Sequence, residues 1–422
     1  MENRLHAERN VLFAPQLPES AAEMQFCGTV VRSAAEWNAL TFSGPRLAFM
    51  TGAADEVAAL IGACTDRDVH FRVVRELVDG VLVTSSERAE WVSRGQIPLY
   101  AIGRQGVFFR ECFQSADFFQ RVTREHAFQE LTESNKPSLA LRTGIYLSQV
   151  TQVDERSLSF NLLRCSTNLR GPTENFAPTD REIINQTNAL LPFFFAERTA
   201  VNHVLAQVYH NRADAADGSG KETKAKISRH SDKTKDMAAS GVLAFATFYD
   251  WGSLPNKRNS PTDAFDVCHR GGTSVFTAID WQLKDAASHP NLVRQCRIKM
   301  YANSLLIVGL DTNRLFTHEI KPSTLHVADI PVRLGYVMRC SKTLAVHRDG
   351  RTFIVDEDGQ QLELASITPE SAHTIKTLYR DENITEQRVQ YPLILTSLNE
   401  GDFLPPTLNP PLAEPPAANH SD

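Results

Sequence analysis

The sequence lacks paired cysteines. Its seven cysteines are an odd number, are widely spaced, and include no CxxC pair. This spacing predicts neither a disulfide framework nor a structural zinc site. Long apolar runs are also missing, since no uninterrupted stretch reaches about 18 apolar residues, and we expect no membrane span. No apolar segment follows the opening residues MENRLHAERN, which argues against a secretory signal and favours an intracellular protein, cytoplasmic or nuclear.

Positive charge is not in excess either. The formal net charge is −6, which excludes a globally basic nucleic-acid binder but leaves room for a local basic patch. Hydrophobic residues are 42% and charged residues 22% of the 422, so a disordered or fibrous chain is excluded. A chain of this length is long enough for two domains. We therefore expect a globular protein.

The first part of the chain reads as an irregular arm over residues 1–25, followed by a smaller α/β domain over 26–115. Glycine is scarce where a dinucleotide-binding loop would need several, because RLAFMTGAA contains one. A structural or substrate-shaping role is favoured for this domain. We expect strands over 46–52, 69–74 and 80–85, and helices over 54–64 and 87–95.

Residues 116–200 are expected to connect this domain to the next and to pack on it. They contain a possible strand pair, 144–150 with 158–165, and a helix that begins near Thr179 or Asp180. Over 201–400 many short strands alternate with turn residues, which predicts an antiparallel sandwich or barrel and an α+β protein overall. These strands are expected over 203–209, 224–230, 242–250, 274–283, 295–301, 304–310, 314–320, 332–340, 343–347 and 352–356. Residues 403–422 read as a disordered, proline-rich tail.

A metal-binding pattern lies in this β-rich part. His230 and Asp232 stand two apart on a predicted strand, where alternation points both side chains to one face. His318 stands far downstream at the end of another strand-like run. Two histidines and one carboxylate on one face are the ligand set of non-haem iron(II) oxygenases, which leaves coordination positions open. Beyond it, Arg333 and Arg339 are six residues apart on a predicted strand and so share a face, where a guanidinium can clamp a dicarboxylate bidentately.

Around these residues the sequence resembles the Fe(II)/2-oxoglutarate-dependent dioxygenases, and within them the AlkB-like branch. The resemblance covers roughly residues 202–345 and rests on four segments: LAQVY (205–209), AKISRHSDK (225–233), NRLFTHEIKP (313–322) and RLGYVMR (333–339). It implies a double-stranded β-helix, or jelly-roll, core. It also implies a reaction in which a C–H bond is hydroxylated while 2-oxoglutarate gives succinate and CO2, with demethylation as the outcome for an N-methyl group.

The resemblance also implies roles for individual residues. His230, Asp232 and His318 would bind Fe(II). Arg333 would pair with the far carboxylate of 2-oxoglutarate, and Arg339 would lie near its other end. The co-substrate would accept hydrogen bonds from Tyr209 and Gln207. The chain departs from the family in its longer loops between 209 and 230 and between 232 and 318, and in Gly335, which stands where members often carry a polar co-substrate contact.

The substrate is open between three possibilities. The first is modified nucleic acid, single-stranded or with a flipped base, which would need an aromatic stacking group such as Tyr249 or Trp251. A basic cluster at the pocket mouth could then bind phosphate, or could be a solvated face. It comprises Lys221, Lys224, Lys226, Arg229, Lys233 and Lys235. The second possibility is a protein side chain or small metabolite, and the third is a catalytically silent binding module, against which the intact triad and both arginines argue.

Other histidines are interpreted as structural. A second HxD pattern, His347-Arg348-Asp349, is followed by Gly350 and predicts a turn between two strands. Cys268 with His269 next to two glycines predicts a loop. His203 and His210 flank the first barrel strand and are expected to be packed or solvated rather than ligands. Oligomeric state cannot be read from the sequence.

Overall fold

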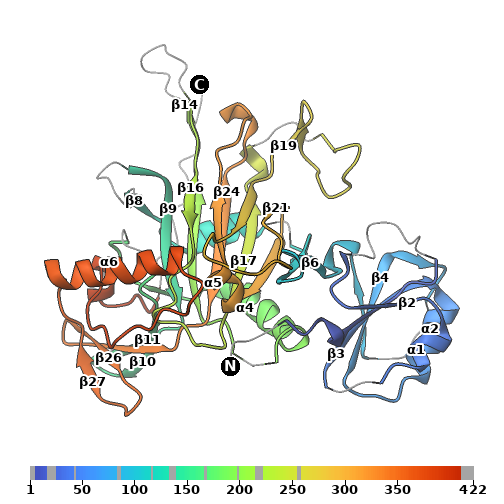
Figure 1. Cartoon of the computed structure of the whole chain (residues 1–422), viewed down its shortest axis with the longest axis horizontal. Coiled ribbons are helices and arrows are strands. Elements are labelled where there is room, and N and C mark those ends of the chain that lie inside the picture. Colours follow the sequence, from blue (N-terminus) through green and yellow to red (C-terminus); the bar gives the residue numbers. More distant parts are fainter. Residues whose placement is uncertain are drawn as a thin grey trace.

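The computed structural model describes residues 5–16, 25–41, 44–82, 87–115, 117–132, 139–165, 169–196, 199–213, 222–253 and 258–409 (Figure 1). Within these residues the chain is rich in strands and has few helices. No helix in the described ranges combines the length and the apolar character needed to cross a membrane.

Five parallel strands form an N-terminal sheet in the order β2-β1-β3-β4-β5. They are β1 (Asn10–Phe13), β2 (Thr29–Val31), β3 (Arg46–Ala53), β4 (Val69–Asp79) and β5 (Ala89–Val92). Two helices, α1 (Ala34–Asn38) and α2 (Ala54–Ala63), lie on the side facing away from the rest of the chain (Figure 1). The predicted strand over 46–52 and helix over 54–64 are thus confirmed.

Three expectations for this region are wrong. The segment expected to be an irregular arm contains β1, whose four residues are all buried between β2 and β3. The segment 87–95, expected to be a helix, forms β5 because its backbone completes the open edge of β4. The strand expected over 80–85 does not continue β4, since Gly80 turns the chain with a φ of 98°; residues 83–86 lie outside the described residues.

Nine strands form the central sheet, in the order β12-β9-β13-β24-β17-β22-β7-β6, with β8 paired to β9. They are β6 (Leu99–Ala101), β7 (Gly106–Phe109), β8 (Gln129–Thr132), β9 (Leu139–Ser148), β12 (Glu174–Asn175), β13 (His203–Tyr209), β17 (Val242–Tyr249), β22 (Ser304–Gly309) and β24 (Arg333–Arg339). Strands on both sides of the expected borders at 115 and 200 therefore belong to one sheet. Those borders do not separate structural units here.

A smaller sheet faces the central one. Its order is β16-β23-β20-β21, and all its pairs are antiparallel. The strands are β16 (Ile227–His230), β20 (Ala278–Leu283), β21 (Gln295–Lys299) and β23 (Phe316–Ile320). The short helix α5 (Leu310–Leu315) leads from β22 directly into β23. Apolar side chains of both sheets, such as Phe245 from β17 and Trp281 from β20, share one buried cluster.

The opposite face of the central sheet is covered by two helices, α3 (Phe118–Glu125) and α4 (Pro178–Leu190). Apolar residues of these helices, of the central sheet and of the N-terminal sheet form a single buried cluster. The predicted helix near Thr179 is confirmed as α4, whose first turn is held by Asp180 Oδ2 accepting from the Ala177 N–H at 2.8 Å. The central sheet is thus buried on both faces.

A third sheet, order β10-β11-β25-β26-β27, packs beside the central one. Its strands are β10 (Thr151–Asp154), β11 (Ser157–Leu162), β25 (Thr343–Arg348), β26 (Arg351–Val355) and β27 (Gln361–Glu363). The expected pairing of 144–150 with 158–165 is wrong, because these segments become β9 and β11 in different sheets. The turn predicted at HRDG is confirmed: Asp349 and Gly350 have φ of 49° and 76° between β25 and β26.

The last part of the chain is the helix α6 (Pro369–Ile384) and an extended stretch that returns to the core. The tail expected from 403 is wrong in part, because Thr407 exchanges backbone hydrogen bonds with Thr173 and Asn175 at 2.9 Å each. Residues 410–422 lie outside the described residues. Two small hairpins, β14 (Arg212–Ala213) with β15 (Glu222–Thr223) and β18 (His269–Arg270) with β19 (Thr273–Ser274), complete the fold.

Candidate metal centre

The structure brings the predicted triad together. β16 pairs antiparallel with β23, and His230 lies directly across from His318, with 4.4 Å between the ring centroids. Asp232 follows two residues after His230, and its Oδ1 is 3.7 Å from His230 Nε2. One possible ligand atom from each of the three side chains lies within 4.8 Å of the others. This spacing suits a single metal ion.

The surroundings of the two histidine rings suit metal binding. His230 Nδ1 is 2.8 Å from the carbonyl oxygen of Ser228, so a proton on Nδ1 would be donated there and the Nε2 lone pair would face Asp232. Burial, reinforced by nearby His230, lowers the pKa of His318 to about 3, which keeps its ring neutral. The Nδ1 atom of His318 is buried and has no hydrogen-bond partner in the described part of the chain.

Arg339 determines the charge state of Asp232. Burial by itself would raise the pKa of Asp232, but Arg339 and then His230 outweigh burial and hold it well below its usual range. Arg339 Nη2 lies 3.2 Å from each carboxylate oxygen. The other two guanidinium nitrogens, Nε and Nη1, are buried without a hydrogen-bond partner among the described residues. A buried donor of this kind is costly unless a ligand or water accepts from it.

His203 adds two further unpartnered nitrogens. It pairs across the strands with Arg339, so both side chains project from the same face of the central sheet. Both ring nitrogens of His203 are buried and without a partner in the described ranges. Burial, then the positive charge of Arg339, lowers the pKa of His203 to about 3. The expectation of a packed histidine is thus met in the burial of His203, and no described residue forms a hydrogen bond with its ring beside Arg339.

Arg333 begins β24 on the same face as Arg339, as their even spacing predicts. It lies between Tyr209 of β13 and Tyr249 of β17 and is buried. Its guanidinium carbon is 3.9 Å from the centre of the Tyr209 ring, and Tyr209 Oη donates to Gln207 Oε1 at 2.8 Å. No carboxylate among the described residues pairs with Arg333. Three of the predicted co-substrate residues, Arg333, Tyr209 and Gln207, therefore lie together, whereas the fourth, Arg339, pairs with Asp232.

Gly335 makes room for this group. A Cβ at position 335 would lie 3.0 Å from Arg333 Nη1 and 3.1 Å from Tyr209 Cε2. The missing side chain thus lets the guanidinium and the phenol ring lie close over the strand. At Gly335, the position where the sequence departs from the family pattern, the Arg333 guanidinium lies next to the space that a side chain would occupy.

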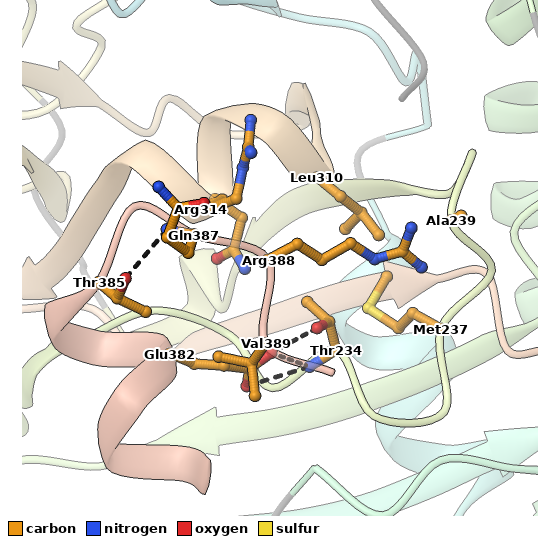
Figure 2. Close-up of a pocket in the computed structure, with 11 residues that line it drawn as sticks. Thr234, Met237, Ala239, Leu310, Arg314, Glu382, Thr385, Gln387, Arg388 and Val389 are labelled. Atoms are coloured by element: carbon orange, nitrogen blue, oxygen red, sulfur yellow. Dashed lines mark hydrogen bonds between the residues drawn. The ribbon is translucent and has the colours of Figure 1, made fainter. Parts of the chain in front are cut away.

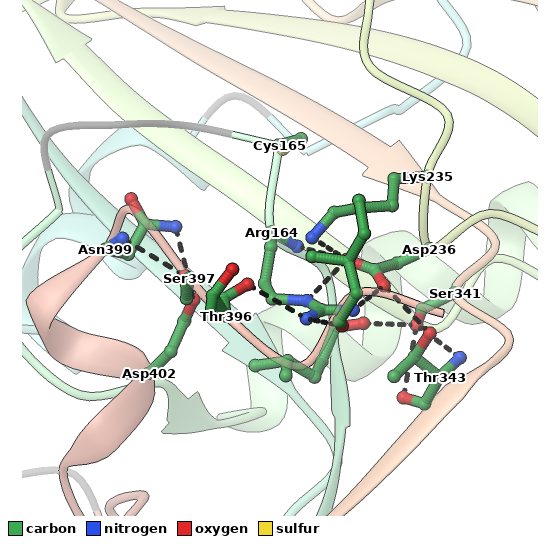
Figure 3. A network of polar contacts seen from close by, with 12 residues as sticks. Arg164, Cys165, Lys235, Asp236, Ser341, Thr343, Thr396, Ser397, Asn399 and Asp402 are labelled. Carbon is green, nitrogen blue, oxygen red and sulfur yellow. Dashed lines mark hydrogen bonds and ion pairs between the residues drawn. The ribbon is translucent and has the colours of Figure 1, made fainter. Parts of the chain in front are cut away.

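Four residues of the predicted basic cluster are engaged in contacts with other parts of the protein. Lys233 donates to the carbonyls of Ser231 and Tyr379 and to Asn383 Oδ1, so it is directed toward α6. Lys235 has a side chain only 4% exposed and lies 3.6 Å from Asp236 in an internal network (Figure 3). Lys224 pairs with Glu222 at 3.1 Å and Arg229 with Glu319 at 2.8 Å. Lys226 is exposed, and Lys221 lies outside the described residues.

The expected stacking aromatics are packed against each other. Tyr249 is 2% exposed, and its hydroxyl donates to the carbonyl of Met300 at 2.8 Å. Its ring lies 5.8 Å from Trp251 and 5.1 Å from Phe276, centre to centre. Tyr249 therefore supports the fold next to Arg333. A flipped base would have to displace neighbouring side chains in order to stack on Tyr249, while Trp251 is half-buried.

A second group with metal-ligand chemistry lies elsewhere and is fully satisfied. Glu125, His126 and Asp180 have possible ligand atoms within 4.8 Å. His126, however, uses both ring nitrogens, Nδ1 with Glu174 at 2.8 Å and Nε2 with Asp180 at 2.6 Å. Tyr336 donates to the other oxygen of Asp180 at 2.7 Å. These contacts leave no lone pair of His126 for a metal, unlike the rings of the triad.

Sequence reasoning missed the side chain that holds the Asp232 backbone in place and a second asparagine that holds the neighbouring Ser231. Asn313 of α5 accepts from the Asp232 N–H and donates to the Asp232 carbonyl, at 2.9 Å each. Asn383 of α6 accepts from the Ser231 N–H at 2.9 Å. An asparagine five residues before the distal histidine has no recognisable signal, because its role depends on a contact 81 residues away in the chain.

Comparisons with known proteins find only distant structural similarity. No family model matches the sequence, and no curated protein matches it. A solved structure of a Pseudomonas putida prolyl-4-hydroxylase is similar with a TM-score of 0.27 and 10% identity, over 54% of this chain and 89% of that one. The structure of OsALKBH1 is similar with a TM-score of 0.30 and 12% identity, over 56% and 96%. Both TM-scores are below 0.5, so the function is argued from the site itself.

Proposed function

We propose that the protein is an Fe(II)- and 2-oxoglutarate-dependent dioxygenase built on a jelly-roll core. The observation that carries this proposal is the convergence of His230, Asp232 and His318 from two antiparallel strands, with Arg339 against the carboxylate. Unpartnered nitrogens of His318 and Arg339 fit a site that binds a metal and an anionic co-substrate. In the satisfied cluster around His126 the same residue types lack this property.

The roles follow from the positions. His230, Asp232 and His318 hold the iron, and Arg339 keeps the Asp232 carboxylate ionised and oriented. Arg333 supplies the positive charge for the far carboxylate of 2-oxoglutarate, with Tyr209 and Gln207 alongside. Once bound, iron and 2-oxoglutarate supply the oxidising chemistry: O2 is consumed, 2-oxoglutarate becomes succinate and CO2, and a substrate C–H becomes C–OH. If that carbon is an N-methyl group, the product loses formaldehyde and the result is demethylation.

For the substrate, a modified nucleic acid is the proposal that follows from the AlkB-like resemblance. One set of observations favours the alternative, a protein side chain or a small metabolite. Of the six basic residues expected to contact phosphate, Lys233 and Lys235 are held in internal contacts and two others are paired with acidic side chains. Nucleic-acid affinity depends on phosphate contacts of this kind.

The test is succinate release by anaerobically Fe(II)-loaded protein after oxygen is admitted. Arg351→Ala is the control, since its side chain is 63% exposed and pairs with Glu363 in the third sheet, which contains none of the triad residues. We expect 2-oxoglutarate-dependent succinate from the wild type and from Arg351→Ala, and none from His230→Ala. Methylated single-stranded DNA, methylated RNA and a metabolite extract are then added separately, and the pool that stimulates turnover identifies the substrate class. Succinate that persists in His230→Ala would contradict the proposal.

A further inference from the structure

The segment that carries Asp232 leaves its strand just after His230. The antiparallel ladder between β16 and β23 includes His230 opposite His318 and ends there. Asp232 is 6% exposed, so its backbone N–H and C=O need partners from elsewhere in the protein. Both partners are atoms of one side chain, the carboxamide of Asn313.

Asn313 acts here as a substitute for a neighbouring strand. Its Oδ1 accepts from the Asp232 N–H and its Nδ2 donates to the Asp232 carbonyl, both at 2.9 Å. A carboxamide has the same donor and acceptor as a peptide group, so this exchange copies the hydrogen-bonded pair of an antiparallel sheet. Asn313 is 2% exposed, and water does not compete for these bonds. The side chain of Asn313 therefore holds the backbone of Asp232, and this backbone sets the direction of the Asp232 side chain.

The location of Asn313 links two metal-ligand segments. It lies in α5, which continues directly into β23 and His318. Ser231 strengthens the same link, because its hydroxyl donates to the Phe316 carbonyl at 3.0 Å. A displacement of Asp232 relative to His318 would have to break the Asn313 pair. The side chain thus sets the spacing between two of the three proposed ligands.

The residues around Asp232, 231–234, are also held by α6, through contacts that do not involve Asp232 itself. Asn383 Oδ1 accepts from the Ser231 N–H at 2.9 Å and from Lys233 Nζ at 2.8 Å. Glu382 accepts from the Thr234 N–H at 3.0 Å, beside a cavity of about 40 Å³ that is also lined by α5, including Asn313, and by residues 385–389 after α6 (Figure 2). These contacts provide a natural comparison, since Asn383 and Asn313 each make two hydrogen bonds to the same short stretch.

We infer that Asn313 is the positioning residue of the metal centre, which fixes Asp232 relative to His318. This inference rests on the proposed function, because it assumes that these two side chains bind one metal. Groups that orient metal ligands from outside the coordination sphere typically change metal affinity by about 10–100-fold when they are removed. Removal of Asn313 releases both backbone groups of Asp232, whereas removal of Asn383 releases none of them.

The experiment is a Co(II) titration of the full-length metal-free protein, followed by the visible absorption of the bound ion and by calorimetry. Asn313→Ala and Asn313→Asp are compared with wild type and with Asn383→Ala, and thermal unfolding is recorded for all four. We expect Asn313→Ala to weaken Co(II) binding by about 10–100-fold and to alter the absorption spectrum. Asn313→Asp keeps the acceptor but faces the Asp232 carbonyl with a carboxylate, and it should also weaken binding; it provides the test if the alanine variant does not fold.

The outcomes separate the two proposals. Asn383→Ala should bind Co(II) close to the wild-type affinity with an unchanged spectrum, even where its unfolding temperature falls. Equal losses of affinity in the Asn313 and Asn383 variants would overturn the positioning role and leave the metal centre intact. Unchanged binding in both Asn313 variants would do the same. A wild-type protein that binds no Co(II) would overturn the proposed function together with the inference.

Discussion

Arg339 and Asp232 form a buried ion pair in which one guanidinium nitrogen, Nη2, lies 3.2 Å from both carboxylate oxygens. Arg339 is 3% and Asp232 6% exposed, so each charge depends on the other for compensation. The carboxylate proposed to bind a metal is thus already neutralised by a cation from the central sheet. This pairing gives Asp232 a structural role in addition to its role as a ligand.

Asp232→Ala should therefore lower the free energy of unfolding more than His230→Ala. Removing one partner of a buried pair typically costs about 3–5 kcal/mol, because the other charge is left uncompensated. His230 has a side chain that is 32% exposed, and its loss should cost far less. Urea unfolding monitored by circular dichroism measures both. Both substitutions should abolish metal binding. Equal destabilisation by the two would contradict the structural role of Asp232.

Arg333→Ala should weaken 2-oxoglutarate binding by at least about tenfold and leave metal affinity unchanged. An ion pair or bidentate hydrogen bond to a charged group contributes about 1.5–3 kcal/mol, and a 1.4 kcal/mol loss is a factor of ten. Calorimetric titration of the Co(II)-loaded protein with 2-oxoglutarate measures the effect, and Arg351→Ala is the control. Parallel losses of metal and co-substrate affinity in Arg333→Ala would show that the residue acts on the fold and not on the co-substrate.

Asp236→Ala should be strongly destabilising although it lies outside the proposed site. Asp236 accepts from Arg164 Nη2 at 2.6 Å and from Thr343 Oγ1 at 3.0 Å, and Arg164 Nη1 donates to the carbonyls of Ile394 and Thr396 (Figure 3). We expect a loss of about 3–5 kcal/mol in urea unfolding.

The matched comparison for Asp236 is an exposed pair. Arg297 pairs with Asp280 at the surface, where its own side chain is 64% exposed. Arg297→Ala should cost about 1 kcal/mol or less, because solvent screens such pairs. Similar costs for Asp236→Ala and Arg297→Ala would mean that the internal network does not hold the C-terminal stretch to the core.

Stability should fall in alkaline solution because of His126. Burial alone would lower the pKa of His126, but the hydrogen bonds to Asp180 and Glu174 outweigh it and raise the pKa from 6.5 to about 9. A raised pKa in the folded state stabilises the protein below the unfolded value of about 6.5, and that contribution is lost as the pH rises through about 9. His126→Gln does not titrate in this range. The unfolding free energy of wild type relative to His126→Gln should therefore shrink between about pH 6 and about pH 10; a constant difference would mean that the imidazole is neutral throughout.

The sequence predicted the parts of the fold that depend on local pattern. Runs such as residues 46–52 and 203–209 alternate or are wholly apolar, and they form strands as expected. The helix expected over 87–95 failed because partner choice outweighed local preference: Ala89–Val92 completes the edge of β4. The borders expected at 115 and 200 failed for a related reason, since strand pairing between distant segments leaves no compositional trace.

The site, too, was predicted only where the signal is local in the sequence. Residues whose chemistry is unusual for their position, such as His230, Asp232 and Arg333, stood out in the sequence. The structure brings the triad together with Arg339 against it, and Arg333 shares the strand face of Arg339. Lys233 and Lys235 did not follow their predicted role because α6 and Asp236 turn them inward. Asn313 gave no sequence signal, because its contact to Asp232 exists only when α5 and the metal-binding segment meet.

The hydrogen bonds between α6 and the Asp232 segment have a consequence for synthesis of the protein. Asn383 and Ser231 are 152 residues apart, yet the side chain of one accepts from the backbone of the other. During translation, the ribosome releases the three proposed ligands well before it releases α6. At about 5–20 residues per second, several seconds pass in which a nascent chain carries all three proposed ligands but not yet α6. Iron that binds in that interval would meet the Asp232 segment before α6 adds its hydrogen bonds to Ser231 and Lys233.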